Sequence, residues 1–326
     1  MNVLTEKYIN PFTDFGFKKL FGSEVNKDIL IDFLNALLEG EESTIVDLTF
    51  ITNEQLGEQI VDRRAIFDLY CENELGEKFI VELQKSKQNF FKDRSLYYAS
   101  FPIREQAKKG DWNFELKAIY TIAILDFVFD EDKNDLDKYF YKVKLTDVDT
   151  HKVFYDKLTF IYLEMPKFQK ELSELTTHFE RWMYVFRNLS RLQSYPERLQ
   201  EKIFKKFFKQ AEIAQLPQEK RHEYEQSLKY YRDLNNVIDT AFDEGKEEGK
   251  LEGKLEGKIE GKIEGKIEGK IEGKIEGKLE GKIEGKLEGQ MVIIKTMLDN
   301  GLDLETISKL TGLTMSDIKQ LEIKLS

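Results

Sequence analysis

The segment from residue 64 to residue 87 constrains the fold more than any other part of the chain, because it contains two runs of β-forming residues separated by a short polar turn. The turn, Asn73-Glu74-Leu75-Gly76, consists largely of residue types that favour chain reversal. In both runs, apolar residues occupy both sets of alternating positions, which is typical of strands covered on both faces. The segment therefore predicts a β-hairpin inside a larger sheet.

Three polar side chains, Asp68, Glu82 and Gln84, interrupt these apolar runs. If the turn is centred on Leu75, residues whose numbers add up to 150 face each other, so Asp68 lies opposite Glu82 and Gln84 follows on the same face. Facing carboxylates have Cβ atoms about 4.5–5.5 Å apart and repel each other. A divalent cation reverses that effect, because carboxylate oxygens at about 2.0–2.6 Å are the ligands that Mg²⁺ and Ca²⁺ prefer. The hairpin thus predicts a metal site.

Two other interpretations of the acids remain open at this point. One of the two carboxyl groups could carry a proton, with no metal present. A register shifted by one residue would instead send Asp68 to the opposite face and leave each acid with hydrogen bonds of its own. Spacing alone does not choose among the three.

The wider sequence resembles a known family. Asp68 followed by Glu82-Leu83-Gln84 resembles the active-site motif of the PD-(D/E)xK nuclease superfamily, in the variant that ends in Gln. Three further segments resemble the Rpn family of recombination-promoting nucleases, also described as transposases: NPFTDFGFKKLFG at residues 10–22, Arg94 with Tyr97-Tyr98, and YLEMPKF at residues 162–168. The resemblance covers roughly residues 1–240.

This resemblance implies an α/β fold with a restriction-endonuclease-like core, an αβββαβ mixed sheet flanked by helices. It also implies cleavage of DNA with Mg²⁺, or with Mn²⁺ or Ca²⁺, in which Asp68, Glu82 and Gln84 are catalytic and the two acids bind the metal. The superfamily usually ends the motif with lysine, so Gln84 is a departure, and Lys87 or Arg94 could supply the missing positive charge. Asp14 is an accessory candidate for metal or water binding. Its alternative role is a favourable interaction with a helix dipole.

Composition sets limits on location. The chain of 326 residues contains a single cysteine, Cys71, which excludes an intrachain disulfide. No basic and then apolar leader opens the sequence, and the longest apolar run, residues 119–129, is interrupted by Asp126 and too short to span a bilayer. We therefore expect a soluble, cytoplasmic protein with no membrane partner. The three histidines have no ligand spacing, and no feature indicates an organic cofactor.

The net charge of −11 requires that any DNA contact use a local basic patch. Residues 84–119 supply one, with eight lysines or arginines against four acids. The spacing predicts a helix over 93–108 that presents Arg94, Arg104 and Lys108 to solvent or to DNA phosphates. Its other face is expected to be buried and consists of Leu96, Ala99, Ser100, Ile103 and Ala107.

The remaining pattern completes a nuclease-like domain over residues 1–243, with its core at 10–128. Helices are predicted from the N-cap Thr13 to Gly22 and over 26–38, and strands over 43–52, 60–62 and 116–127. Additional strands at 139–145 and 158–163 precede helices that begin near Pro166, His178 and Pro196. The basic and aromatic stretch 202–209 could bind nucleic acid, but its spacing favours an amphipathic core helix.

The chain ends in two segments of different character. Residues 244–290 repeat Gly-Lys-Ile/Leu-Glu, and because glycine costs about 1 kcal/mol relative to alanine in a helix, we expect a marginal, partly helical spacer. Its glycine and Ile/Leu stripes would also allow self-association into a homo-oligomer. Residues 291–326 predict three short helices that resemble a helix-turn-helix, although their balanced charge favours a docking or oligomerisation tail over DNA contact.

The sequence therefore predicts a divalent-metal-dependent DNA endonuclease that could serve recombination or transposition. The alternative function is a non-catalytic DNA-binding or assembly module that retains the nuclease fold, because Gln84 replaces the usual lysine.

Overall fold

The computed structural model describes residues 6–40, 44–51, 54–55, 65–107 and 113–325. The chain divides into two compact units, Met1–Thr240 and Ala241–Ser326, and the first of these contains the sheet.

Within the described residues, six strands form one mixed sheet in the order β1-β4-β5-β6-β8-β7. Neighbours β1–β4, β4–β5 and β7–β8 are antiparallel, whereas β5–β6 and β6–β8 are parallel. A separate short pair joins β2 to β3. The strands are β1 (Leu48–Phe50), β2 (Glu54–Gln55), β3 (Ala65–Ile66), β4 (Leu69–Asn73), β5 (Lys78–Gln84), β6 (Ile119–Leu125), β7 (Phe140–Thr146) and β8 (Val153–Glu164).

The β4–β5 hairpin has the register that the sequence predicts. Leu69 pairs with Val81 and Cys71 pairs with Phe79, so the facing residue numbers add up to 150. Gly76 in the turn has φ +80°, a conformation that favours glycine. Of the predicted strand over 43–52, the described residues 44–51 form a strand only in β1, and the predicted extension over 60–62 lies outside the described residues.

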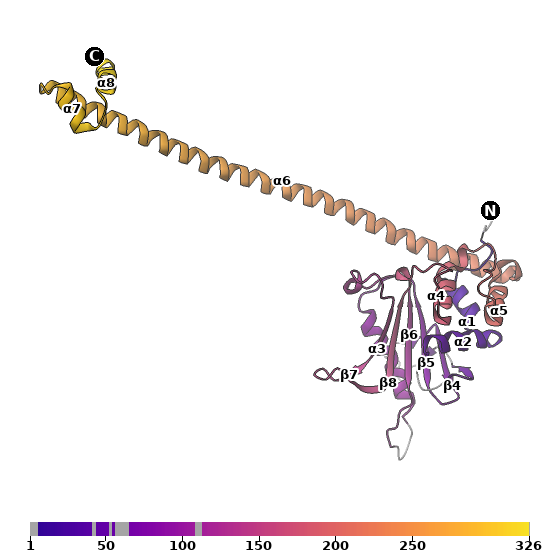
Figure 1. Cartoon of the computed structure of the whole chain (residues 1–326). Coiled ribbons are helices and arrows are strands. Elements are labelled where there is room, and N and C mark those ends of the chain that lie inside the picture. Colours follow the sequence, from indigo (N-terminus) through magenta and orange to yellow (C-terminus); the bar gives the residue numbers. More distant parts are fainter. Residues whose placement is uncertain (1–5, 41–43, 52–53, 56–64, 108–112, 326) are drawn as a thin grey trace. The chain divides into compact units, whose positions relative to one another are not determined.

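Helices cover both faces of this sheet, as Figure 1 shows, with α3 on one side and α1, α2, α4 and α5 on the other. Along β5 the side chains alternate between these layers: Phe79, Val81 and Leu83 belong to the large core cluster with α1, α2, α4 and α5, and Ile80 packs with Phe101 of α3. The helices of this unit are α1 (Asp14–Phe21), α2 (Lys27–Leu37), α3 (Phe91–Glu105), α4 (His178–Asn188) and α5 (Lys202–Ala211), with short 3₁₀ turns η1 (Glu24–Asn26), η2 (Asp130–Asp132), η3 (Met165–Lys167), η4 (Leu189–Arg191) and η5 (Ile213–Gln215).

The N-terminal motif has a structural explanation. Thr13 caps α1 by accepting a hydrogen bond from the Gly16 amide at 3.0 Å. A Cβ atom at Gly16 would lie only 2.1 Å from the carbonyl oxygen of Asn10, so no larger residue fits there. The Asn10 side-chain oxygen in turn accepts the Phe12 amide at 2.9 Å. The sequence NPFTDFG therefore builds a tight entry into α1.

The predicted buried face of the helix over 93–108 is wrong in detail. The buried face of α3 contains Phe91, Ser95, Ala99 and Pro102, whereas Leu96 is 54% exposed. The reason is a long-range contact, since the Ser95 hydroxyl lies 2.7 Å from the Tyr162 hydroxyl of β8 and fixes how α3 rotates on the sheet.

The helices predicted near Pro166 and Pro196 also differ from the structure. Only the 3₁₀ turn η3 forms at Pro166, and residues 196–201 precede α5 as turns. Residues 202–209 do form the predicted core helix, with Phe204, Phe207 and Phe208 buried in α5.

The repeat is more helical than the sequence predicts, because it belongs to one continuous helix, α6 (Gln218–Asp299). No proline interrupts it, and its glycines all have negative φ, so every residue can keep helical geometry until Gly301 at φ +76°. Beyond Gly301, α7 (Leu304–Thr311) and α8 (Met315–Leu325) follow. Ile307 of α7 and Ile318 of α8 pack with Ile294 of α6 in a small buried cluster. No helix in the part of the chain that the structure describes is long and apolar enough to cross a membrane.

Candidate active site

The acids Asp68 and Glu82 lie at the β4–β5 hairpin, where the strand ladder gives way to side-chain hydrogen bonds. A Glu82 carboxylate oxygen accepts the Asp68 amide at 3.2 Å, and an Asp68 carboxylate oxygen accepts the Leu83 amide at 2.8 Å. Each acid therefore bonds to the backbone of the opposite strand. This reciprocal arrangement, which we call the acid pair, holds two carboxylates next to each other at the edge of α3.

The environment of the acid pair disfavours two negative charges. Burial and then the negative charge of Asp68 raise the pKa of Glu82 to about 8. Burial also raises the pKa of Asp68 above its ordinary value. Two adjacent carboxylates in such a place either share a proton or bind a cation.

Gln84 is held at both ends of its amide. Its nitrogen donates to the Ser86 carbonyl oxygen at 2.8 Å, and its oxygen accepts from the Arg94 guanidinium at 2.5 Å. Arg94 also donates to the Gln88 side chain, and its guanidinium lies 4.8 Å from the centre of the Phe91 ring. The hydrogen-bond partners of Arg94 are thus neutral amides, which leave its positive charge beside the acid pair.

Helix α1 brings charged side chains close to the acid pair. Asp14 makes an ion pair with Lys85 at 2.8 Å, and it is near enough to Asp68 to raise the pKa of that carboxyl. Lys18, four residues after Asp14 on the same helix, lies close enough to favour the ionised forms of Asp68 and Glu82. Lys18 is not among the site residues predicted from the sequence. Its spacing from Asp14 was the available signal, since residues four apart share a helix face.

The other basic candidates are distributed more widely. Lys87 forms an ion pair with Asp130, which is not a member of the acid pair. Arg104 is exposed on α3 and lies 5.5 Å from the centre of the Phe101 ring. Lys108 lies outside the described residues. Tyr98, in contrast, lies close to the acids. Burial raises the pKa of its hydroxyl, and the negative charge of Glu82 raises that pKa further.

Comparison with protein families gives this geometry a context. A family model described as PD-(D/E)XK nuclease family transposase matches residues 11–241, most of the chain. The chain belongs to this nuclease family. Its mixed sheet, with helices on both faces, is accordingly a restriction-endonuclease-like α/β fold, as the resemblance implied.

A second family model, described as the C-terminal HTH domain of the Rpn/YhgA-like nuclease family, matches residues 288–322. It covers the end of α6, α7 and most of α8, and it places the chain in the Rpn branch of these nucleases. The helix-turn-helix likeness that the sequence suggested is thereby confirmed. No curated protein and no solved structure gives a significant match.

The donor set of the nuclease site fits a divalent ion of the Mg²⁺ type. Among the residues that the structure describes, no group of three or more His, Cys, Asp or Glu side chains is arranged to hold a metal. Mg²⁺ does not need such a cage, because it commonly uses one or two protein carboxylates and completes its shell with water and substrate phosphate. The acid pair supplies two hard oxygen ligands whose mutual repulsion a cation would relieve.

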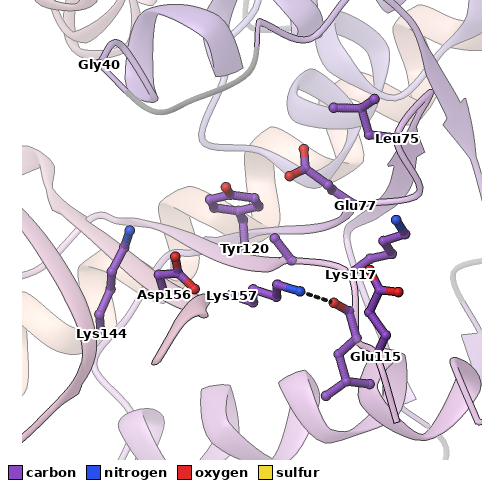
Figure 2. Close-up of a pocket in the computed structure, with 11 residues that line it drawn as sticks. Gly40, Leu75, Glu77, Glu115, Lys117, Tyr120, Lys144, Asp156 and Lys157 are labelled. Atoms are coloured by element: carbon purple, nitrogen blue, oxygen red, sulfur yellow. Dashed lines mark hydrogen bonds between the residues drawn. The ribbon is translucent and has the colours of Figure 1, made fainter. Parts of the chain in front are cut away.

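A pocket lies elsewhere on the nuclease fold, where β5 and β6 begin (Figure 2). It has a volume of 720 Å³, and the Lys157 ammonium donates to the Leu116 carbonyl oxygen at 3.0 Å on its wall. Its charged lining residues balance in sign: Lys117, Lys144 and Lys157 against Glu77, Glu115 and Asp156. None of Asp68, Glu82 and Gln84 lines this pocket. The acid pair, which carries the motif residues, is therefore the candidate active site.

Proposed function

We propose that the chain is a divalent-metal-dependent DNA endonuclease that hydrolyses phosphodiester bonds and so serves recombination or transposition. The observation that carries this proposal is the acid pair: two adjacent, mostly buried carboxylates at the motif positions of a nuclease family, with raised pKa values. A stable core has no need for such a pair, because burying two like charges costs free energy unless a cation accompanies them.

Asp68 and Glu82 would hold the ion, with Mg²⁺ favoured and Mn²⁺ or Ca²⁺ as substitutes. When bound, the ion would activate a water molecule and offset the charge that develops on the scissile phosphate. The backbone amides of Asp68 and Leu83 fix the orientation of the two carboxylates.

Gln84 has a positioning role in this proposal. Because its side chain is uncharged, Gln84 cannot take the part of the usual lysine as a cation, and both ends of its amide are already hydrogen-bonded. It instead places the Arg94 guanidinium, and Arg94 and Lys18 supply positive charge near the phosphate. Asp14 would act through Lys85 and Asp68, and Lys87 and Arg104 would contact DNA further from the cleaved bond.

A DNA partner is expected for both parts of the chain, since the C-terminal match is to a helix-turn-helix domain. The proposed division is that the nuclease unit cleaves and the tail adds a second DNA contact. The Ile/Leu positions of the repeat, 48–70% exposed from Leu251 to Leu287, would join chains into a homo-oligomer.

The test is a plasmid assay with the purified full chain. Supercoiled plasmid should be nicked with Mg²⁺ or Mn²⁺ and left intact in EDTA, and Asp68→Asn and Glu82→Gln should each remove the nicking. Glu115→Gln, in the distant pocket, is the matched control and should nick like the wild type. If both acid-pair variants nick at the wild-type rate, the site has been misplaced or a contaminant cuts. If the wild type binds DNA but never cuts, the chain is the non-catalytic module.

A further inference from the structure

Phe90 combines two unfavourable features at one position beside the nuclease site. Its side chain is 79% exposed, and its backbone is left-handed at φ 61°, ψ 29°. Large apolar side chains rarely adopt that conformation, which glycine, asparagine or aspartate accept more easily. The exposed ring adds no buried apolar surface to the fold, so it is available to contact a ligand.

The backbone connects Phe90 directly to the site. The Phe90 carbonyl oxygen accepts the Arg94 amide at 2.9 Å in the first turn of α3, and the Arg94 side chain reaches Gln84 at 2.5 Å. Phe90 therefore lies one helical turn from the guanidinium that borders the acid pair. Within the described ranges, no aromatic ring and no cation contacts the Phe90 ring.

The surroundings of Phe90 suit a nucleic acid better than a protein core. Tyr97, two turns further along α3, is 47% exposed, and its ring is held edge-on by Phe101 at 5.0 Å. Arg94 lies between these two residues along α3, and its guanidinium reaches the Gln84 oxygen at 2.5 Å. Aromatic rings interleaved with basic side chains are the arrangement that binds bases by stacking while the backbone phosphates bind the cations.

We propose that Phe90 stacks on a base that has left the duplex next to the scissile phosphate, so that the preferred substrate is DNA with an unpaired or bulged base. The proposal rests on the proposed nuclease function and adds the substrate class. The Phe90 ring is exposed, and contact of such an apolar ring with DNA bases is a known way to unstack them.

The test uses Phe90→Gly, because glycine removes the ring and adopts the left-handed backbone conformation without strain. The variant should be at least as stable as the wild type in thermal unfolding. Its affinity for a duplex with one bulged base should fall about 5- to 100-fold, the effect of losing one stacked base. Affinity for the fully paired duplex of the same sequence should change little. Both are measured by fluorescence anisotropy in EDTA, and Phe90→Trp should retain the preference.

Phe114 offers a matched control. It has the same φ, 61°, and is 77% exposed, but it precedes β6 at the other end of the sheet. Phe114→Gly should leave binding of both duplexes unchanged.

Four results would overturn the inference. Equal losses on the two duplexes, or equal effects of Phe90→Gly and Phe114→Gly, would exclude base stacking by Phe90. If the wild type nicks plasmid with Mg²⁺ but shows no preference for the bulged duplex, the proposed nuclease function stands and the stacking role of Phe90 is excluded. A wild type that binds neither duplex and cuts nothing would remove both proposals.

Discussion

Among single residues, Glu82 carries a charge whose burial costs stability. Its ordinary pKa is 4.5 and its pKa in the fold is about 8, so between these values the folded protein holds more protons than the unfolded chain. Stability then falls as pH rises through this window. The penalty is absent below about pH 4.5 and complete above about pH 8.

Glu82→Gln should therefore stabilise the metal-free protein at high pH. Glutamine has the shape of the protonated acid and no charge to bury, so the free energy of unfolding at pH 8.5 should rise by about 2–4 kcal/mol. At pH 4 the two proteins should be nearly equal. Denaturant unfolding in EDTA measures this, and a variant that is less stable than the wild type at pH 8.5 would show that the charge of Glu82 supports the fold.

Arg94 should contribute one phosphate contact to DNA binding. Arg94→Ala is expected to weaken binding and to reduce the slope of log K against log salt by about one, since one counterion fewer is released. Lys209→Ala, an exposed charge on α5, is the control and should leave the slope unchanged. An unchanged slope in Arg94→Ala as well would mean that Arg94 only positions Gln84.

At the scale of elements, the YLEMPKF motif ties the end of β8 to residues 129–132, which follow β6. Glu164 and Lys167 are both buried and form an ion pair at 2.7 Å. Glu164 also accepts the Phe129 amide at 2.7 Å, and the Lys167 ammonium donates to the Asp132 carbonyl oxygen at 2.8 Å. These bonds fix the segment that follows β6, on the α3 side of the sheet.

Lys167→Met should therefore destabilise the fold strongly. Removal of one partner leaves the Glu164 charge buried and unpaired, at a cost of about 3–5 kcal/mol in the free energy of unfolding. Lys92→Ala breaks the exposed pair with Glu131 and should cost about 1 kcal/mol or less. Comparable losses in the two variants, measured by denaturant unfolding, would contradict the structural role given to the motif.

The hairpin could be predicted from the sequence because its information is local. Turn residues and alternation within residues 64–87 fix the register, and the register brings Asp68 to Glu82. The rotation of α3 could not be predicted, since it depends on Ser95 meeting Tyr162 of β8. Lys18 was missed for the same reason, because its closeness to the acid pair depends on how α1 packs against the sheet.

In the chain as a whole, the repeat within α6 is the least explained part. An isolated helix with a glycine at every fourth position loses about 1 kcal/mol at each, and Lys faces Lys and Glu faces Glu one turn away. The Ile and Leu side chains of the repeat remain mostly exposed. Association between chains would offset these costs by burying apolar surface.

Truncation after Asp243 should accordingly leave a folded nuclease unit but reduce the number of associated chains. Analytical ultracentrifugation of the full chain should give a larger assembly than the truncated chain. A second variant keeps the length of the chain and should also give a smaller assembly than the wild type. It replaces four isoleucines of the repeat by glutamine: Ile259, Ile263, Ile267 and Ile271. Equal assembly sizes would leave the repeat as a spacer, and an unfolded truncation would show that the domain boundary at residue 243 is wrong.

The central claim, that the acid pair binds a divalent ion, is tested most directly by calorimetric titration of Mn²⁺ into the metal-free protein at pH 7. Because Glu82 has a pKa of about 8, it is mostly protonated there, so the wild type should bind one ion per nuclease unit and release close to one proton. Buffers of different ionisation enthalpy reveal the proton. Binding should be lost in Glu82→Gln and retained in Glu115→Gln. A Glu82→Gln protein that titrates like the wild type would contradict the account.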